Sequence, residues 1–271
     1  MRLANKVAVV TGAAGGLGEG ISRCLAAEGA KVMLSDLQEQ ATEQLAAAMT
    51  DDGYEVATHR TDVTQRSDTE ALCDAAIAKF GQVDFLISNA GVDGLPKGDS
   101  PAAPLIENVT DDDWDAVMDV NLKGVFLTCR AFIPYFKEQG AGRIINISSV
   151  AGRQGLEFLA PYAASKAGVI SFTQSLALQL APFRVNANTI CPGIIWTPMW
   201  ERLANFLSNT TPSDQSVKPE EMFDSVVQQM IPFGAPQQAQ DIGDSVVFLC
   251  APESKEITGQ ALNVCGGIRM N

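Results

Sequence analysis

Short apolar runs alternate with longer segments of helical periodicity along most of the chain. The runs that we expect to be strands span residues 7–12, 31–36, 56–63, 83–91, 143–149, 185–193 and 260–267. Amphipathic segments such as GEGISRCLAAEG and DTEALCDAAIAKFG lie between them, each with a glycine near its end. Strands that alternate with helices form βαβ units. The pattern therefore predicts an α/β fold with a doubly wound parallel sheet of about seven strands and helices on both faces.

One segment departs from this alternation. Residues 194–229 contain helical pieces broken by a polar, proline-containing stretch, and no strand. Ligands bind such sheets at the carboxyl ends of the strands, where a long excursion is typical of a lid. We therefore predict a single Rossmann-like domain over residues 1–271, with a helical substrate lid at about 194–229.

Composition and charge exclude several kinds of partner. The chain is 46% hydrophobic and 19% charged, which is ample for a core. A run of about 18 apolar residues is absent, and the N-terminus lacks the layout of a signal peptide, so we expect a cytoplasmic protein with no membrane partner. The net charge of −13 disfavours nucleic acid as a partner.

The cysteines and the single histidine do not suggest a metal site. The six cysteines are scattered, and five of them have apolar neighbours, which favours buried thiols over disulfides or metal ligands. His59 stands in the alternating stretch EVATHRTDV, which favours a structural place on a strand. No metal is expected.

The stretch TGAAGGLG (11–18) joins the first predicted strand to a helix. Gly12, Gly16 and Gly18 allow a tight turn, a close approach of the backbone to a pyrophosphate, and a helix that begins next to the sheet. A glycine cluster alone is a weak signal, but its place at the start of a βαβ unit favours a dinucleotide site.

Asp36 ends the second predicted strand, eighteen residues after Gly18. A carboxylate at this position can accept hydrogen bonds from the ribose hydroxyls of an adenosine, and it repels a 2′-phosphate. Asp36 also fits a capping box with Glu39, and both roles are possible at once because a carboxylate has several acceptor sites. Because no Lys or Arg occurs in the glycine turn or at Leu37, we predict NAD as the cofactor rather than NADP.

Tyr162 and Lys166, in PYAASKAGV, lie one helical turn apart with small residues between them. This spacing arises by chance on many helices. The alternative is a proton-transfer pair, because oxidation of an alcohol needs a base near neutral pH. Lowering the pKa of a tyrosine from about 10 to about 7 requires ~4 kcal/mol of preferential phenolate stabilisation. A nearby ammonium has the right sign of charge.

Taken together, the motifs resemble those of the short-chain dehydrogenase/reductase family, nearly from end to end. The matching stretches are TGAAGGLG, Asp62-Val63, NAG (89–91), DVNLKGVF, NISSVAG, YAASK, PGIIWTP (192–198) and ITGQALNVCGG. The resemblance implies an oxidoreductase with a catalytic tetrad of Asn121, Ser149, Tyr162 and Lys166. Ser149 is chosen over Ser148 because it stands thirteen residues before the tyrosine. In this scheme Ser149 binds the substrate oxygen and Asn121 holds a water of the proton relay, although a structural role of Asn121 at a kink remains open.

The resemblance also implies a set of cofactor contacts. They are Gly12, Gly16, Leu17, Gly18, Asp36, Asp62, Val63, Asn89, Ala90, Gly91, Tyr162, Lys166, Pro192, Ile195 and Thr197. The substrate candidates are Ser149, Leu156, Trp196 and Trp200, with Gln154 and Val92 as further pocket positions. The two tryptophans either roof an apolar substrate or pack the lid onto the body, and the sequence favours neither.

PGIIWTPMWE and the length of the lid resemble the diol, polyol and secondary-alcohol dehydrogenases of the family. We therefore expect NAD-dependent interconversion of a small diol, polyol or cyclic alcohol and its ketone. A 3-oxoacyl-thioester reductase is the first alternative, and a non-catalytic NAD(H)-binding sensor is the second. The family further implies a homotetramer, built on the segments near 111–138 and 160–180.

Overall fold

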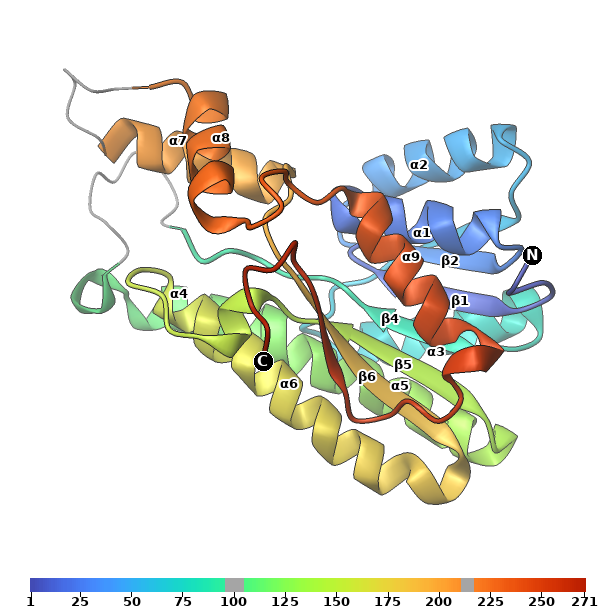
Figure 1. The fold of residues 1–271 in the computed structure, drawn as a ribbon. Helices are drawn as coiled ribbons and strands as arrows, with labels where there is room; N and C mark the ends of the chain where they lie inside the picture. Colours follow the sequence, from blue (N-terminus) through green and yellow to red (C-terminus); the bar gives the residue numbers. More distant parts are fainter. Residues whose placement is uncertain (96–104, 211–216) are drawn as a thin grey trace.

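The computed structural model describes residues 1–95, 105–210 and 217–271. Within these residues, seven strands form one sheet, and helices cover both of its faces (Figure 1). The strands are β1 (Val7–Thr11), β2 (Lys31–Asp36), β3 (Val56–Arg60), β4 (Phe85–Ser88), β5 (Gly142–Ile147), β6 (Val185–Pro192) and β7 (Ala261–Val264). The helices are α1 (Leu17–Ala27), α2 (Glu39–Asp51), α3 (Arg66–Phe80), α4 (Asp111–Met118), α5 (Gly124–Gln139), α6 (Ala160–Leu180), α7 (Pro198–Thr210), α8 (Pro219–Met230) and α9 (Ala239–Cys250).

The order of the strands is β3-β2-β1-β4-β5-β6-β7, and every neighbouring pair is parallel. Strand β1 lies between β2 and β4, so the chain winds outward in one direction as far as β3 and then crosses to the other side. The connections that follow β1 and β4 therefore diverge, which opens a crevice at the carboxyl ends of the two strands. The predicted doubly wound α/β fold is confirmed.

Two apolar cores flank the sheet because successive strand residues point to opposite faces. On β1, Ala8 and Val10 join the core made with α1, α2 and α9, whereas Val7 and Val9 join the core made with α3, α5 and α6. Both sides of the strand are buried, which explains why its sequence is apolar throughout rather than alternating.

Strands β3, β4 and β7 are each clearly shorter than the predicted runs, and the ends of β3 and β4 have a visible cause. β3 ends at Arg60 because Asp62 turns the chain, with its carboxylate accepting hydrogen bonds from the main-chain N–H and the hydroxyl of Thr64. β4 ends at Ser88 because the next residue, Asn89, turns toward the glycine loop instead of continuing the ladder. In both places the polar residues at the end of the run leave the sheet.

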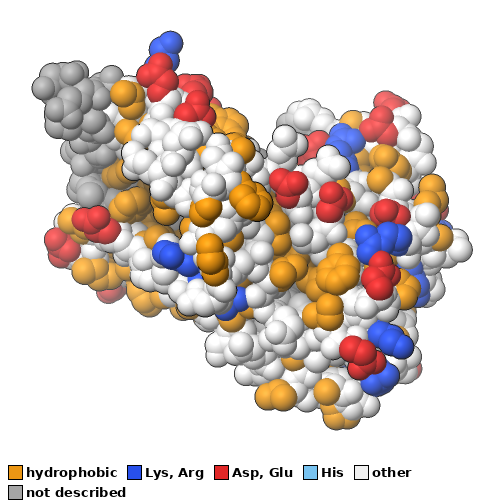
Figure 2. Space-filling model, viewed as in Figure 1, with side chains coloured by type: hydrophobic (Ala, Val, Ile, Leu, Met, Phe, Trp, Pro, Cys, Tyr) orange, Lys and Arg blue, Asp and Glu red, His pale blue; other side chains and the backbone are white. Residues whose placement is uncertain are grey.

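Helices α7 and α8 occupy most of the predicted lid segment, of which residues 211–216 lie outside the described residues. A third apolar cluster lies beneath them, formed by Val150, Ile194, Phe223, Val227, Ile231, Cys265 and Ile268. The surface is hollowed between the part that carries these helices and the part that carries α1 and α2 (Figure 2). The hollow lies on the side of the molecule where the strands end.

Candidate active site

Two glycines of the turn between β1 and α1, Gly12 and Gly18, have no room for a side chain. A Cβ atom on Gly18 would lie 1.9 Å from the carbonyl oxygen of Gly12, and one on Gly12 would lie 2.7 Å from the Cα of Ala90. Gly12 and Gly16 also have positive φ angles of 65° and 56°. The turn thus brings backbone amides and the N-terminus of α1 to the edge of the crevice, as a bound pyrophosphate requires. The cradle fits a dinucleotide.

Asp36 closes this cradle from the end of β2. Its Oδ2 accepts a hydrogen bond of 3.0 Å from the main-chain N–H of Ala14, and its Oδ1 accepts one of 3.0 Å from Gln38. The predicted capping box with Glu39 is wrong: α2 begins at Glu39 with Gln38 as its cap and without a side-chain capping bond. Asp36 instead fixes the glycine turn, and each oxygen keeps a second lone pair for a ribose.

Asn89 ties the end of β4 to the same turn. Its side-chain amide donates to the carbonyl oxygens of Thr11, at 3.2 Å, and Gly12, at 2.9 Å. The polar atoms of Asn89 thus hold the two diverging loops together across the crevice. This contact explains why an asparagine is needed at the point where the chain leaves β4.

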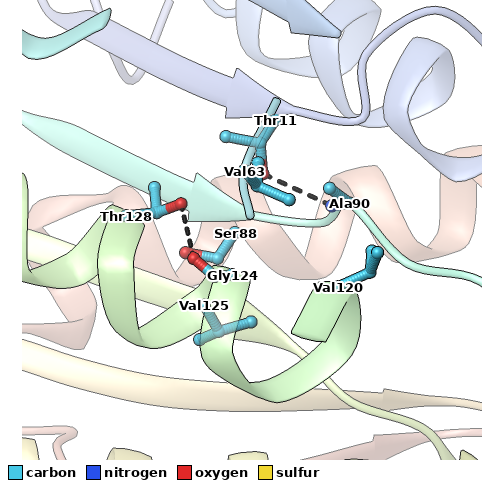
Figure 3. Close-up of a pocket in the computed structure, with 8 residues that line it drawn as sticks. All are labelled: Thr11, Val63, Ser88, Ala90, Val120, Gly124, Val125 and Thr128. Atoms are coloured by element: carbon cyan, nitrogen blue, oxygen red, sulfur yellow. Dashed lines mark hydrogen bonds between the residues drawn. The ribbon is translucent and has the colours of Figure 1, made fainter. Parts of the chain in front are cut away.

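A narrow crevice lies behind these loops, and Figure 3 shows its walls. They are formed by Thr11, Val63, Ser88, Ala90, Val120, Gly124, Val125 and Thr128. Two of the hydroxyls are already engaged: Thr11 accepts from the main chain of Ala90, and Thr128 donates to Gly124. Val63 and Ala90, both predicted cofactor contacts, therefore stand on a largely apolar wall. The carboxylate of Asp62, the residue before Val63, accepts a hydrogen bond from the main-chain N–H of Thr64 in the turn after β3.

Tyr162 and Lys166 lie on one face of α6, as their spacing predicts, and Ser149 faces them from the end of β5. The Nζ atom of Lys166 is 5.7 Å from the centroid of the Tyr162 ring. It donates a hydrogen bond of 3.1 Å to the carbonyl oxygen of Ile147. Ser148 points away from the phenol and donates to the main-chain oxygen of Lys166. The choice of Ser149 over Ser148 thus agrees with the side-chain directions.

Burial controls the protonation of this pair. The pKa of the Tyr162 phenol is raised, first by burial and then by the charge of Asp93, while its hydrogen bond with Ser149 acts in the opposite direction. Burial lowers the pKa of Lys166 to about 8. The pKa of Tyr162 is therefore raised on balance, because removing the phenolate from water costs more free energy than the hydrogen bond with Ser149 returns. A protonated phenol is suited to donate a proton.

Asn121 is fully buried in a π-helical segment, Asp119–Lys123, between α4 and α5. Its Oδ1 accepts from the N–H of Val92 at 2.8 Å, and its Nδ2 donates to the carbonyl oxygen of Val92 at 2.9 Å and to the hydroxyl of Ser165 at 3.2 Å. The structural role left open by the sequence is thus present. Both amide hydrogens are used, so a relay water would have to donate to an oxygen of Asn121.

Three further cofactor candidates lie along the chain that leaves β6. Pro192 is the last residue of β6, and Ile195 is buried. Thr197 lies beside the glycine turn, since a Cβ on Gly16 would be 3.6 Å from it.

Two more predicted cofactor contacts lie in other parts of the chain. Gly91 lies toward the tetrad, since a Cβ on it would be 3.4 Å from the Nζ of Lys166. Leu17 opens α1, next to Gly16. Thr197 and Gly91 thus lie beside the glycine turn and the tetrad, respectively.

The tryptophans of the lid pack against Phe223 of α8. The ring of Trp196 is 4.8 Å from that of Phe223, the ring of Trp200 is 5.4 Å away, and both contacts are edge-to-face. This favours the packing role for both residues, although Trp196 remains 40% exposed and can still meet a ligand. Leu156, Gln154 and Val92 are partly exposed.

Sequence reasoning missed an ion pair at this site. Asp93, on the chain that follows Gly91, binds Arg202 of α7 with an Nη2–Oδ2 distance of 2.7 Å. No local pattern could have revealed it, because the partners are 109 residues apart. Phe223 was missed for a similar reason, since only the packing of α8 on α7 shows which aromatic side chain meets the tryptophans.

His59 lies on a strand and most of the cysteines are buried, as the sequence predicts. His59 lies on β3 and shares a hydrogen bond with Thr61, and five of the six free cysteines are buried. Across 1–95, 105–210 and 217–271, no group of three or more acidic, cysteine or histidine side chains could hold a metal ion. No helix among the described segments is long and apolar enough to cross a membrane.

The family model for short chain dehydrogenase matches residues 6–207, and the chain belongs to this family. It is an oxidoreductase by that membership. The chain is 36% identical to galactitol 2-dehydrogenase of Agrobacterium fabrum over 98% of both chains. Two solved structures are also similar. NAD+-bound xylitol dehydrogenase has a TM-score of 0.90 and 30% identity, with 98% of this chain and 100% of that chain covered. A variant of actinorhodin polyketide ketoreductase with NADPH has a TM-score of 0.87 and 35% identity, with 97% of both chains covered.

Proposed function

We propose that the protein interconverts a small, uncharged secondary alcohol and its ketone with NAD, and that Tyr162 transfers the proton. The observation that carries the proposal is the group formed by Tyr162, Ser149 and Lys166, which stands beside the glycine cradle. A non-catalytic NAD(H) sensor has no use for a half-buried phenol that forms a hydrogen bond with a serine hydroxyl. A diol, polyol or cyclic alcohol is the proposed substrate class, supported by the polyol dehydrogenases among the relatives.

The chain's own residues divide the work. Ser149 orients the substrate oxygen toward the phenol, which places that oxygen within hydrogen-bond reach of the proton donor. In ketone reduction Tyr162 gives its proton to the forming alkoxide, and its raised pKa keeps that proton on the phenol until the transfer. Lys166, whose Nζ donates to the carbonyl oxygen of Ile147, stays mostly protonated at pH 7 and places a positive charge near the phenolate that is left. A bound nicotinamide dinucleotide supplies the hydride in one direction and accepts it in the other.

The preference for NAD over NADP is proposed from Asp36. Its carboxylate stands on the glycine turn, and neither that turn nor Leu37 offers a cation to a 2′-phosphate. The relatives differ in cofactor, since one solved structure contains NAD+ and another NADPH. The chain's own residues therefore carry this proposal.

A ketoacyl-type reductase is the second candidate, because the relatives include a polyketide ketoreductase that is 35% identical. The two candidates differ in the substrate that the lid must admit. A diol enters beneath α7 and α8 as a whole molecule, whereas an acyl thioester must leave its carrier outside. Activity on free ketones that exceeds activity on a 3-oxoacyl thioester supports the first.

The experiment is NAD-linked oxidation over a panel of secondary alcohols, diols, polyols and cyclic alcohols, with Tyr162→Phe and Tyr135→Phe compared. Tyr162→Phe should keep NADH binding and lose about 10²–10⁴-fold in kcat/KM. Tyr135, whose hydroxyl accepts from the N–H of Val83 far from the tetrad, is the matched control and should keep its activity. Near-normal turnover by Tyr162→Phe would rule out the assigned proton donor.

A homotetramer is also proposed, on segments 111–138 and 160–180. Large apolar side chains are exposed along them: Trp114 on α4, Phe126 on α5 and Leu178 on α6. Phe126 contacts Phe172 edge-to-face, which joins α5 and α6 into one apolar surface. Sedimentation as a monomer at micromolar concentration would contradict this proposal. A cytoplasmic location is consistent with six free thiols, which persist in a reducing compartment.

A further inference from the structure

The ion pair between Asp93 and Arg202 is asymmetric. The Nε and Nη2 atoms of Arg202 both donate to the Oδ2 of Asp93, at 3.0 and 2.7 Å. The Oδ1 of Asp93 accepts a hydrogen bond of 3.0 Å from the N–H of Leu95. The side chain of Asp93 is 12% exposed, whereas that of Arg202 is 56% exposed. A nearly buried carboxylate is therefore neutralised by a guanidinium that reaches it from α7.

The carboxylate stands on chain that the tetrad already holds. Asp93 follows Val92, whose main-chain N–H and C=O both bind the side chain of Asn121. Asn121 in turn binds Ser165, whose hydroxyl donates to the main-chain oxygen of Tyr162. A continuous set of hydrogen bonds thus connects Asp93 with the helix of the proton donor. The charge of Asp93 also acts on Tyr162, where it raises the pKa of the phenol.

The guanidinium stands on the proposed lid. Helix α7 begins at Pro198, directly after Thr197, the residue beside the glycine turn, and contains Trp200 and Arg202. In Figure 1 the chain that leaves β4 runs out from the sheet toward α7. Arg202 therefore links α7 to the loop that carries Asp93 through an ion pair. This ion pair adds to the aromatic packing of Trp196 and Trp200 on α8.

We propose that Asp93 and Arg202 are positioning residues: their ion pair fixes α7 over the substrate site, and the guanidinium partly offsets a carboxylate charge that acts on Tyr162. This inference rests on the proposed function, in which Tyr162 is the proton donor. The intact pair leaves this side of the site with no net charge, which matches an uncharged alcohol or ketone. Loss of the guanidinium would leave a bare carboxylate that opposes both phenolate formation and an anionic substrate.

The charged and titratable groups around Tyr162 define what must be held constant. They are Lys166 on α6, Asp93 after β4, Arg202 on α7, and Arg153 and Cys191, which interact beside Ser149. Substitutions at Asp93 and Arg202 leave the other three unchanged. Any opposed shift between these two variants therefore comes from the pair itself.

The experiment compares Asp93→Asn with Arg202→Gln. Both break the ion pair and loosen α7, so both should raise KM by more than they lower kcat. The apparent pKa of the tyrosine should move in opposite directions, by about 0.5–1 unit, because Asn removes a negative charge and lowers it, whereas Gln leaves that charge uncompensated and raises it. If the ion pair had only a structural role, both substitutions would shift the apparent pKa of the tyrosine in the same direction. Arg66→Gln, which breaks the exposed pair with Glu70 on α3, is the matched control and should change nothing.

Two readouts do not need turnover and so separate this inference from the proposed function. Absorbance titration of the phenolate, as the difference from Tyr162→Phe, should show the same opposed shifts. Acrylamide quenching in a Trp114→Phe background reports on Trp196 and Trp200, and it should increase in both variants. If the panel yields no substrate but these shifts appear, the pair is a positioning device and the substrate remains to be found. Unchanged quenching, or shifts of the same sign, would overturn the inference.

Discussion

The side-chain amide of Asn121 binds both main-chain groups of Val92, with an Oδ1–N distance of 2.8 Å and an Nδ2–O distance of 2.9 Å. This pair joins the π-helical segment before α5 to the chain that leaves β4, and both ends are buried or half-buried. Removal of this buried amide costs stability, because the main-chain N–H and C=O of Val92 both lose their hydrogen-bond partner at once.

Asn121→Ala should lower the free energy of unfolding by about 2–3 kcal/mol and also lower kcat/KM, since Val92 leads into Asp93 at the site. Urea unfolding and steady-state kinetics measure the two effects. Asn186→Ala is the matched control: its amide bonds the carbonyl oxygens of Lys255 and Ile257, away from the tetrad. It should cost stability but leave kcat/KM intact. Equal catalytic losses in the two variants would contradict the positioning of the site by Asn121.

Lys166→Met should not weaken the fold at pH 7, although it should abolish turnover. Burial lowers the lysine pKa from 10.5 to about 8, so the folded state carries a charged lysine at pH 7 at a cost of about 3 kcal/mol. Between pH 8 and 10.5 the unfolded chain binds the extra proton, and the stability of the parent rises with pH. The advantage of the Met variant at pH 7 should therefore shrink toward pH 10. Lys123→Met, at an exposed pair with Asp119, should show no such pH trend.

The same pKa sets a limit on activity. Above about pH 8, Lys166 loses its charge and the phenolate of Tyr162 loses a stabilising neighbour. Ketone reduction should therefore decline on the alkaline side of pH 8. A flat pH–rate profile from 7 to 10 would show that the charge of Lys166 does not assist the proton transfer.

Asp36→Ser combined with Leu37→Arg should move the preference from NAD to NADP. The change removes a carboxylate that repels the 2′-phosphate and adds a guanidinium at a position that is 52% exposed. We expect at least about a tenfold change in the ratio of NADPH to NADH affinity, which equals about 1.4 kcal/mol. Leu37→Arg alone is the control and should retain a preference for NADH, because Asp36 remains on the turn. Fluorescence titration of both reduced cofactors decides the matter, and an unchanged ratio in the double variant would refute the role of Asp36.

Gly18→Ala should abolish NADH binding and destabilise the fold, because the added methyl group would lie 1.9 Å from the carbonyl oxygen of Gly12. The turn would have to open, and the amides aimed at the pyrophosphate would move with it. Gly15→Ala is a matched control in the same loop: its Cβ meets nothing within 4 Å, and its φ angle is ordinary. It should keep most of the cofactor affinity. Equal losses in both variants would show that the loop tolerates no side chain for another reason.

The sequence by itself determined the features whose residues lie close together along the chain. Apolar runs that alternate with helical segments defined the seven strands and their helices, because both periodicities are set by local backbone geometry. The glycine turn was recognisable since its glycines lie within one loop. Tyr162 and Lys166 were recognisable because residues four apart share a helix face. The sequence also correctly predicted helical structure at the end of the lid segment, where α8 lies.

Only the tertiary structure decided the contacts between distant segments. The pairing of Asp93 with Arg202, of Asn121 with Val92, and of the lid tryptophans with Phe223 depends on the sheet order and on how α7 and α8 pack. Side-chain burial likewise decided the direction of the Tyr162 pKa, because desolvation depends on every element that encloses the phenol. Periodicity along a chain carries no information about which loops meet at the end of a sheet.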